Sequence, residues 1–153
     1  MNSRPKAIVS VFVFNSDGTK ILLGKKVDDG FWSSLTGRLI YGEEFDDCAI
    51  RLLSKHINLL VDKQNDRVKF ICTYNAVSKN KNTHLIAIDY YIQITKEEEK
   101  NYLMINPFLF QSWNWFSLEE VLKMYDHLYM PLQVFLDKFE IGKLDDIKNL
   151  VSN

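Results

Sequence analysis

The sequence predicts a mixed α/β fold in which helices flank a β-sheet. The order of the segments supports this class: β-branched runs come first, then one amphipathic helical stretch, two long β-type runs and further helical segments. These elements do not alternate regularly enough for a doubly wound parallel fold. The length of 153 residues and the hydrophobic content of 46% fit a single domain with its own core.

The N-terminal part is expected to form short strands joined by tight turns. The apolar run 7–14 is rich in β-branched residues and predicts a strand. The Asn-Ser-Asp-Gly sequence at 15–18 is a turn signal, so 20–26 should return as the second strand of a hairpin. Residues 31–35 can form another short strand, and two glycines bracket a compact loop at 38–41.

Residues 43–58 are predicted to form a helix because apolar residues recur there at helical spacing. This apolar stripe consists of Phe45, Cys48, Ala49, Leu52 and Leu53. Acidic residues crowd the first turn, where the helix dipole favours negative charge. Asn58 is expected to be the C-terminal cap of this helix.

The second half of the chain begins with a predicted pair of strands. The runs 67–77 and 84–94 are rich in β-branched and aromatic residues, and a polar turn at 78–82 joins them. A charged connector is expected at 95–106, and a short aromatic strand should follow at 111–116.

The C-terminal part is expected to be helical. Ser117-Leu118-Glu119-Glu120 is a capping box that begins one helix, and Pro131 can begin the next. We expect one domain over residues 1–153, with its core at about 7–139 and a tail at 140–153.

The composition excludes several classes of function. A formal net charge of −1 gives no global electrostatic case for nucleic acid or an anionic membrane, although a local basic patch stays open. No apolar run approaches the roughly 20 residues of a membrane span and no targeting segment is visible, so we expect a cytoplasmic protein without a membrane partner. Cys48 and Cys72 are expected to be free thiols.

One motif carries chemical information. Gly37, Glu43 and Arg51 stand in the spacing Gly, five residues, Glu, seven residues, Arg. Its flanks include Leu22–Lys26, Trp32 and Ser112–Trp115. With these flanks the motif resembles the box of the Nudix hydrolase family, in particular its nucleoside-triphosphate diphosphatase branch, over roughly residues 7–139. The resemblance implies a Nudix-like α/β/α sandwich with a mixed sheet, and Mg²⁺-dependent hydrolysis of nucleoside di- or triphosphates.

The second half of the motif departs from the family pattern. Where the family has Arg-Glu-apolar-any-Glu-Glu, residues 51–56 read Arg-Leu-Leu-Ser-Lys-His. Leu52, Lys55 and His56 therefore replace three glutamates, and their i, i+3, i+4 spacing places them on one helical face. In the family, glutamates on that face hold divalent cations, usually Mg²⁺, which prefers oxygen ligands.

Two functions of different class follow from this departure. The preferred hypothesis is a Nudix-fold protein without standard Mg²⁺-dependent diphosphate hydrolysis, acting as a nucleotide-, RNA- or protein-binding module. In this hypothesis Lys55 and His56 form a positive face that binds phosphate directly with no cofactor, and Trp32 stacks on a base. The loss of all three glutamates favours it.

The alternative is a Nudix hydrolase of nucleoside di- or triphosphates, or related nucleotide derivatives, with a rearranged metal site. Glu43 and Glu44 are then the candidate ligands of Mg²⁺, although the helix dipole also explains acidic residues in a first turn. Arg51, which in the family braces the glutamates, can instead pair with Asp47 at i−4.

Apolar residues near the C-terminus have two interpretations. Packing against the sheet is preferred, and a protein partner or homodimer interface is the alternative. These residues are Leu128, Tyr129, Met130, Phe135 and Phe139. Trp113 and Trp115 are expected to share one face of their strand.

Overall fold

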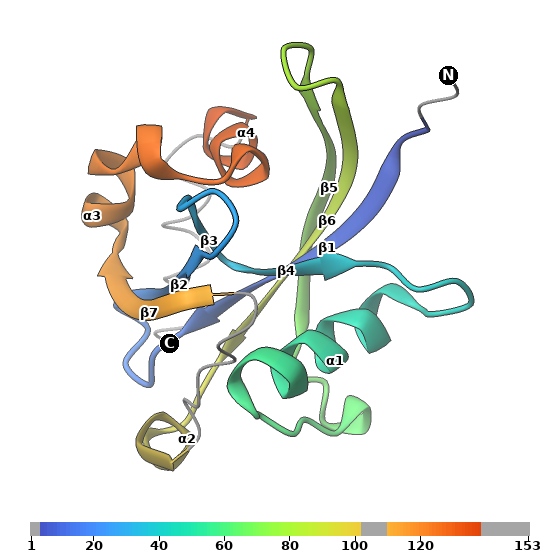
Figure 1. The fold of residues 1–153 in the computed structure, drawn as a ribbon. Helices are drawn as coiled ribbons and strands as arrows, with labels where there is room; N and C mark the ends of the chain where they lie inside the picture. The colour runs from blue at the N-terminus through green and yellow to red at the C-terminus, as the bar shows by residue number, and fades with distance from the viewer. Residues whose placement is uncertain (1–3, 102–109, 139–153) are drawn as a thin grey trace.

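A computed structural model describes residues 4–101 and 110–138 of the chain. In this part the strands form one mixed sheet with the order β3-β2-β1-β6-β5, to which β4 adds on β1 and β7 adds on β2 (Figure 1). The strands are β1 (Lys6–Phe14), β2 (Lys20–Lys26), β3 (Trp32–Ser33), β4 (Leu35–Arg38), β5 (Lys69–Ser78), β6 (Thr83–Gln93) and β7 (Phe110–Ser117). The β1–β6 pair is parallel and the other pairs are antiparallel.

Helices cover both faces of this sheet. They are α1 (Phe45–Ile57), α2 (Lys96–Asn101), α3 (Leu118–Lys123) and α4 (Met130–Lys138), with the short 3-10 turns η1 (Lys63–Asn65) and η2 (Tyr125–His127). Figure 1 shows α1 on one side of the sheet and α3 and α4 on the other. The predicted α/β/α sandwich with a mixed sheet is confirmed.

Strand β1 lies at the centre and is buried on both faces. Its side chains alternate between the two cores, as the pleat of a strand requires. Val9, Val11 and Val13 face the α1 core, and Ile8, Phe12 and Phe14 face the α4 core. The predicted hairpin of β1 and β2 is short, with one paired position at Phe14 and Ile21, because β1 pairs mainly with β4 and β6.

The predicted helix ends are largely confirmed. Helix α1 starts at Phe45, with Glu44 as its N-cap, and ends at Ile57, followed by the C-cap Asn58, whose φ of 57° is left-handed. Both reciprocal hydrogen bonds of the predicted capping box are present at Ser117 and Glu120. None of the described helices is long and apolar enough to cross a membrane.

The first half of the predicted charged connector at 95–106 is helical, which was not predicted from the sequence. Residues 96–101 form α2. A bidentate ion pair anchors this helix: Arg67 Nη2 donates to Glu98 Oε1 at 2.6 Å, and Arg67 Nη1 donates to Glu98 Oε2 at 3.0 Å. The rest of the connector and the tail at 140–153 lie outside the described residues.

Candidate functional site

Glu43 and Arg51 form the best-defined polar contact of the motif. Arg51 Nε donates to Glu43 Oε2 at 2.7 Å, and its Nη2 donates to Glu43 Oε1 at 3.1 Å and to the main-chain oxygen of Arg38 at 2.9 Å. The hydrogen bonds from Arg51 to the Glu43 carboxylate lower the pKa of Glu43 to about 2. The expected pairing of Arg51 with Asp47 is therefore wrong: Asp47 pairs with Lys63 at 3.2 Å instead.

Leu52, which stands at the first replaced glutamate, belongs to the core. Its side chain is 1% exposed and lies directly over Gly37 on β4. A Cβ atom on Gly37 would collide with Leu52 Cδ2, so the glycine of the motif makes room for this leucine. Position 52 is thus part of the packing between α1 and the sheet.

His56, at the third replaced position, also points inward. It is 1% exposed, and its ring lies 5.3 Å from that of Phe110 and 6.3 Å from that of Trp113, centroid to centroid. Burial, reinforced by the positive charges of Lys55 and Arg51, lowers the pKa of His56 to about 4, so the imidazole is neutral near pH 7. Lys55 is exposed. The expected positive face is therefore divided, with Lys55 in solvent and a neutral His56 in the core.

Gly24 on β2 makes this aromatic packing possible. A Cβ atom at Gly24 would lie 2.5 Å from Phe110 Cδ1 and 2.7 Å from Trp113 Cζ3. We expect Gly24→Ala to lower the free energy of unfolding by about 1–3 kcal/mol through overpacking, measured by denaturant titration. The control is the same change combined with Phe110→Leu, where the loss should be smaller. An unchanged stability for Gly24→Ala alone would contradict this packing.

A cleft opens beside β4, on the α4 side of the sheet. We call it the β4 cleft; its volume is about 310 Å³. It is lined by the cations Lys6, Lys26 and Arg38, the hydroxyls of Ser33, Thr36 and Thr83, the apolar Ile8, Leu85, Phe110 and Tyr129, and Gly37. No carboxylate is among these lining residues. The cleft therefore combines positive charge, hydroxyl groups and two aromatic rings.

Neighbouring groups fix the position of one wall of the β4 cleft. The amine of Lys26 lies 3.6 Å from the centroid of the Tyr129 ring and 3.4 Å from Asp29 Oδ2. The main-chain N–H of Tyr129 donates to the oxygen of Trp32 at 2.8 Å. The Trp32 ring packs edge-to-face on Phe116 at 5.1 Å. Trp32 thus supports the wall through its backbone and is not itself a lining residue.

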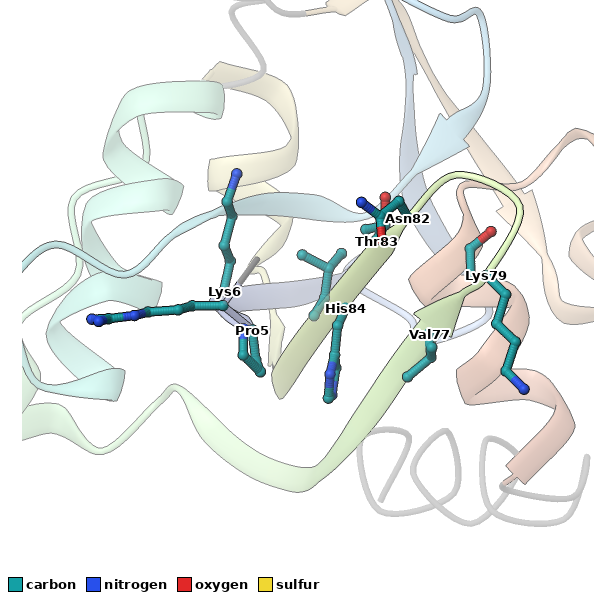
Figure 2. Close-up of a pocket in the computed structure, with 10 residues that line it drawn as sticks. Pro5, Lys6, Val77, Lys79, Asn82, Thr83 and His84 are labelled. Carbon is teal, nitrogen blue, oxygen red and sulfur yellow. The ribbon is translucent and has the colours of Figure 1, made fainter. Parts of the chain in front are cut away.

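A second cavity, of about 420 Å³, lies between the start of β1 and the β5–β6 turn. Its lining includes Arg4, Lys6, Lys79 and His84. Figure 2 shows Lys6 pointing to the opposite side from His84, and the amine of Lys79 directed away from both. Because the amines of Lys6 and Lys79 do not converge, the β4 cleft is the better candidate site.

The family assignment rests on a domain match over most of the chain. The family model described as NUDIX domain matches residues 4–136. This chain belongs to the Nudix family. The segment from Gly37 to Arg51 lies within the matched residues, and the family that the sequence resembles is confirmed.

Solved structures of Nudix proteins share this fold. A MutT protein from Methanosarcina mazei Go1 has a TM-score of 0.70 and 16% identity, covering 92% of this chain and 96% of that chain. The NUDIX domain of Shewanella oneidensis NrtR, complexed with ADP ribose, has a TM-score of 0.64 and 16% identity, covering 90% and 89%. A C. elegans Ap4A hydrolase in a binary complex has a TM-score of 0.61 and 18% identity, covering 88% and 94%. At these identities the likeness concerns the fold.

The residues of this Nudix box do not fit the Mg²⁺ that the family implies. Two of the three glutamate positions carry a buried leucine and a neutral imidazole enclosed by aromatic rings, and the third carries an ammonium group. The carboxylate of Glu43 is engaged by Arg51, and Glu44, the N-cap residue of α1, is a single exposed carboxylate whose side chain makes no cap hydrogen bond. Within residues 4–101 and 110–138, no cluster of three or more His, Cys, Asp or Glu side chains could hold a metal ion.

The sequence prediction and the structure differ most in the cleft. Among the predicted site residues, the structure brings Gly37 into contact with Leu52, and Glu43 into contact with Arg51. Trp32 does not lie near an open face formed by Lys55 and His56. The three cations of the β4 cleft were missed because they come from β1, β2 and β4, which only the sheet order places side by side. The run of Lys25 and Lys26 at the end of a predicted strand was the available signal.

Proposed function

We propose that this Nudix protein binds a phosphate-bearing nucleotide in the β4 cleft without Mg²⁺, and that it lacks the standard hydrolytic activity of the family. The observation that carries the proposal is the charge of the cleft: Lys6, Lys26 and Arg38 line it, and none of its described lining residues is a carboxylate. Lysine and arginine form charge-assisted hydrogen bonds to phosphate, and they supply the positive charge that a metal would otherwise provide.

The nucleotide class is supported by two solved structures of this fold. One is described as an Ap4A hydrolase binary complex and another as a NUDIX domain complexed with ADP ribose. In the proposed mode the phosphates lie against the cations, and a base packs on Tyr129, which lines the same cleft and is partly exposed. The hydroxyls of Ser33 and Thr36 also line the cleft, and both donate to the main-chain oxygen of Ser34, at 2.8 and 3.2 Å, so they can accept a hydrogen bond from a ligand.

The role of the cations is tested by neutralising them one at a time. Lys26→Gln and Arg38→Gln should each weaken binding of ADP by roughly tenfold or more, because each removes one charged contact worth about 1.5–3 kcal/mol. Isothermal titration calorimetry in EDTA measures the change. Lys96→Gln, an exposed lysine on α2 outside the β4 cleft, is the matched control and should bind as the native protein does.

A further variant tests whether phosphate binds in the β4 cleft or on the face of α1 that carries Lys55 and His56, which we call the box face. Lys55→Glu should leave ADP affinity nearly unchanged, because Lys55 is exposed on α1 and does not line the cleft. Loss of binding in Lys55→Glu with retention in Lys26→Gln and Arg38→Gln would instead assign the phosphate to the box face, and would overturn the proposed site.

A further inference from the structure

The segment that joins β4 to α1 displays an unusual amount of apolar surface. We call residues 39–44 the box loop; Figure 1 shows it extending away from the body of the sheet. Tyr41 is fully exposed at 103%, Ile40 is 53% exposed, and Phe45, the first residue of α1, is 46% exposed. Single exposed apolar residues are common, but several within one short protruding segment indicate a contact surface.

The box loop is held in one conformation by its own hydrogen bonds. The N–H of Ile40 donates to Glu43 Oε1 at 3.1 Å, and the N–H of Glu43 donates to the oxygen of Ile40 at 3.0 Å. Gly42 supplies a φ of +84°, and Arg51 fixes the Glu43 carboxylate. A preformed loop loses little conformational entropy when it binds. Glu43 and Arg51, which match the family motif, therefore hold the exposed side chains of Ile40 and Tyr41 in place; we call these two residues the tip.

Charges of both signs flank this tip. Lys6 and Arg38 lie on the side of β1 and β4, and neither has a carboxylate within 4.0 Å in the described part of the chain. Glu44 lies on the side of α1, and it too has no ion-pair partner among the described residues. The surface is thus apolar at its centre, positive on one flank and negative on the other.

We propose that the box loop is the contact surface between two copies of this chain. A two-fold axis through the tip makes the interface isologous, and when it is perpendicular to the line that joins the two flanks, each flank meets the opposite flank of the partner. Tyr41 and Ile40 of the two copies then pack at the centre, and Arg38 of each copy faces Glu44 of the other. This charge complementarity selects a second copy, because a partner of one charge sign would meet repulsion on one flank.

The apolar centre is tested by the mass of the protein in solution. We expect sedimentation velocity over a wide concentration range to show a monomer–dimer equilibrium for the native chain. Tyr41→Ser should weaken the dimer by at least about tenfold, as for a central aromatic contact. Leu60→Ser, which removes another apolar side chain that is 80% exposed, is the matched control and should dimerise as the native chain does. A native chain that stays monomeric, or a Tyr41→Ser variant that dimerises normally, would overturn the proposal.

The flanks are tested by exchanging charge. Arg38→Glu and Glu44→Arg should each weaken the dimer, and the two changes in one chain should restore it, because the pairing across the axis is then reversed. Both side chains are exposed, so circular dichroism should show native folding in every variant. If Arg38→Glu fails to fold, Lys6→Glu takes its place. Failure of the double variant to recover dimerisation would contradict the proposed two-fold arrangement.

Discussion

Replacing Leu52 by glutamate, the residue of the family at this position, should destabilise the protein strongly instead of creating a metal ligand. The side chain at position 52 is 1% exposed and packs over Gly37, and no lysine or arginine is buried among the residues that the structure describes. An unpaired buried charge lowers stability by about 3–5 kcal/mol. We expect Leu52→Glu to reduce the free energy of unfolding by that order, measured by urea titration with and without Mg²⁺.

Two variants serve as controls for Leu52→Glu. Leu52→Met keeps the apolar volume and should lower stability by less than about 1.5 kcal/mol. Lys55→Glu introduces the same carboxylate on the exposed side of α1 and should change stability little. A Leu52→Glu protein that is as stable as the native one, or that is stabilised by Mg²⁺, would show that position 52 faces an open metal site.

Asp89 is expected to give the second large effect, a dependence of stability on pH. Its side chain lies on β6 beneath α4, is 0% exposed, and has no hydrogen-bond partner within 3.5 Å for either oxygen in the described part of the chain. Burial raises the pKa of Asp89 from 3.8 to about 7, and the nearby Tyr74 hydroxyl opposes this only in part. That hydroxyl donates to the main-chain oxygen of Pro131 at 2.9 Å.

The direction of the effect follows from the two states of the chain. Between about pH 4 and pH 7 the unfolded chain loses the Asp89 proton while the folded chain keeps it, so stability falls as the pH rises. A shift from 3.8 to about 7 corresponds to a total loss of about 4 kcal/mol. This contribution is fully present below the unfolded pKa and absent above the folded one.

His56 acts in the opposite direction over nearly the same range. The pKa of His56 is lowered from 6.5 to about 4. As the pH drops from 6.5 to 4, the unfolded chain therefore binds a proton at His56 while the folded chain does not, and the free energy of unfolding falls. The native protein should therefore show a nearly flat profile there. Asp89→Asn removes the opposing contribution, so its stability should rise with pH relative to the native chain.

The measurement is the free energy of unfolding of the native chain and of Asp89→Asn at several pH values from 4 to 8. The difference between the two proteins should grow by about 4 kcal/mol in favour of the variant between pH 4 and pH 7. A difference that stays constant across this range would mean that Asp89 ionises normally in the folded protein.

Local features of the sequence were sufficient to predict the mixed α/β class, and the resemblance to the Nudix family supplied the α/β/α sandwich. The stripe of α1, its cap at Asn58 and the capping box at Ser117 depend on neighbouring residues, and the structure confirms each of them. The prediction that Trp113 and Trp115 share one face is confirmed because both pack against the α1 core. Leu128 and Phe135 are buried in the α4 core, as the preferred interpretation expected.

The candidate site depended on contacts that are distant in the sequence. Whether His56 faces solvent or core is decided by β7, which returns to pair with β2 and places Phe110 against the imidazole ring. The i, i+3, i+4 spacing of the box residues groups them on one face, but it does not say what covers that face. The cations of the β4 cleft are likewise brought together by strand order alone.

Calorimetric titration of ADP in EDTA and in Mg²⁺, with phosphate release measured on the same samples, tests the central claim most directly. We expect binding in EDTA, little change of affinity on adding Mg²⁺, and no release of phosphate, because cations of the protein hold the ligand. Mg²⁺-dependent turnover that disappears in Glu43→Gln or Glu44→Gln would contradict this account and would assign the chain a rearranged Nudix metal site.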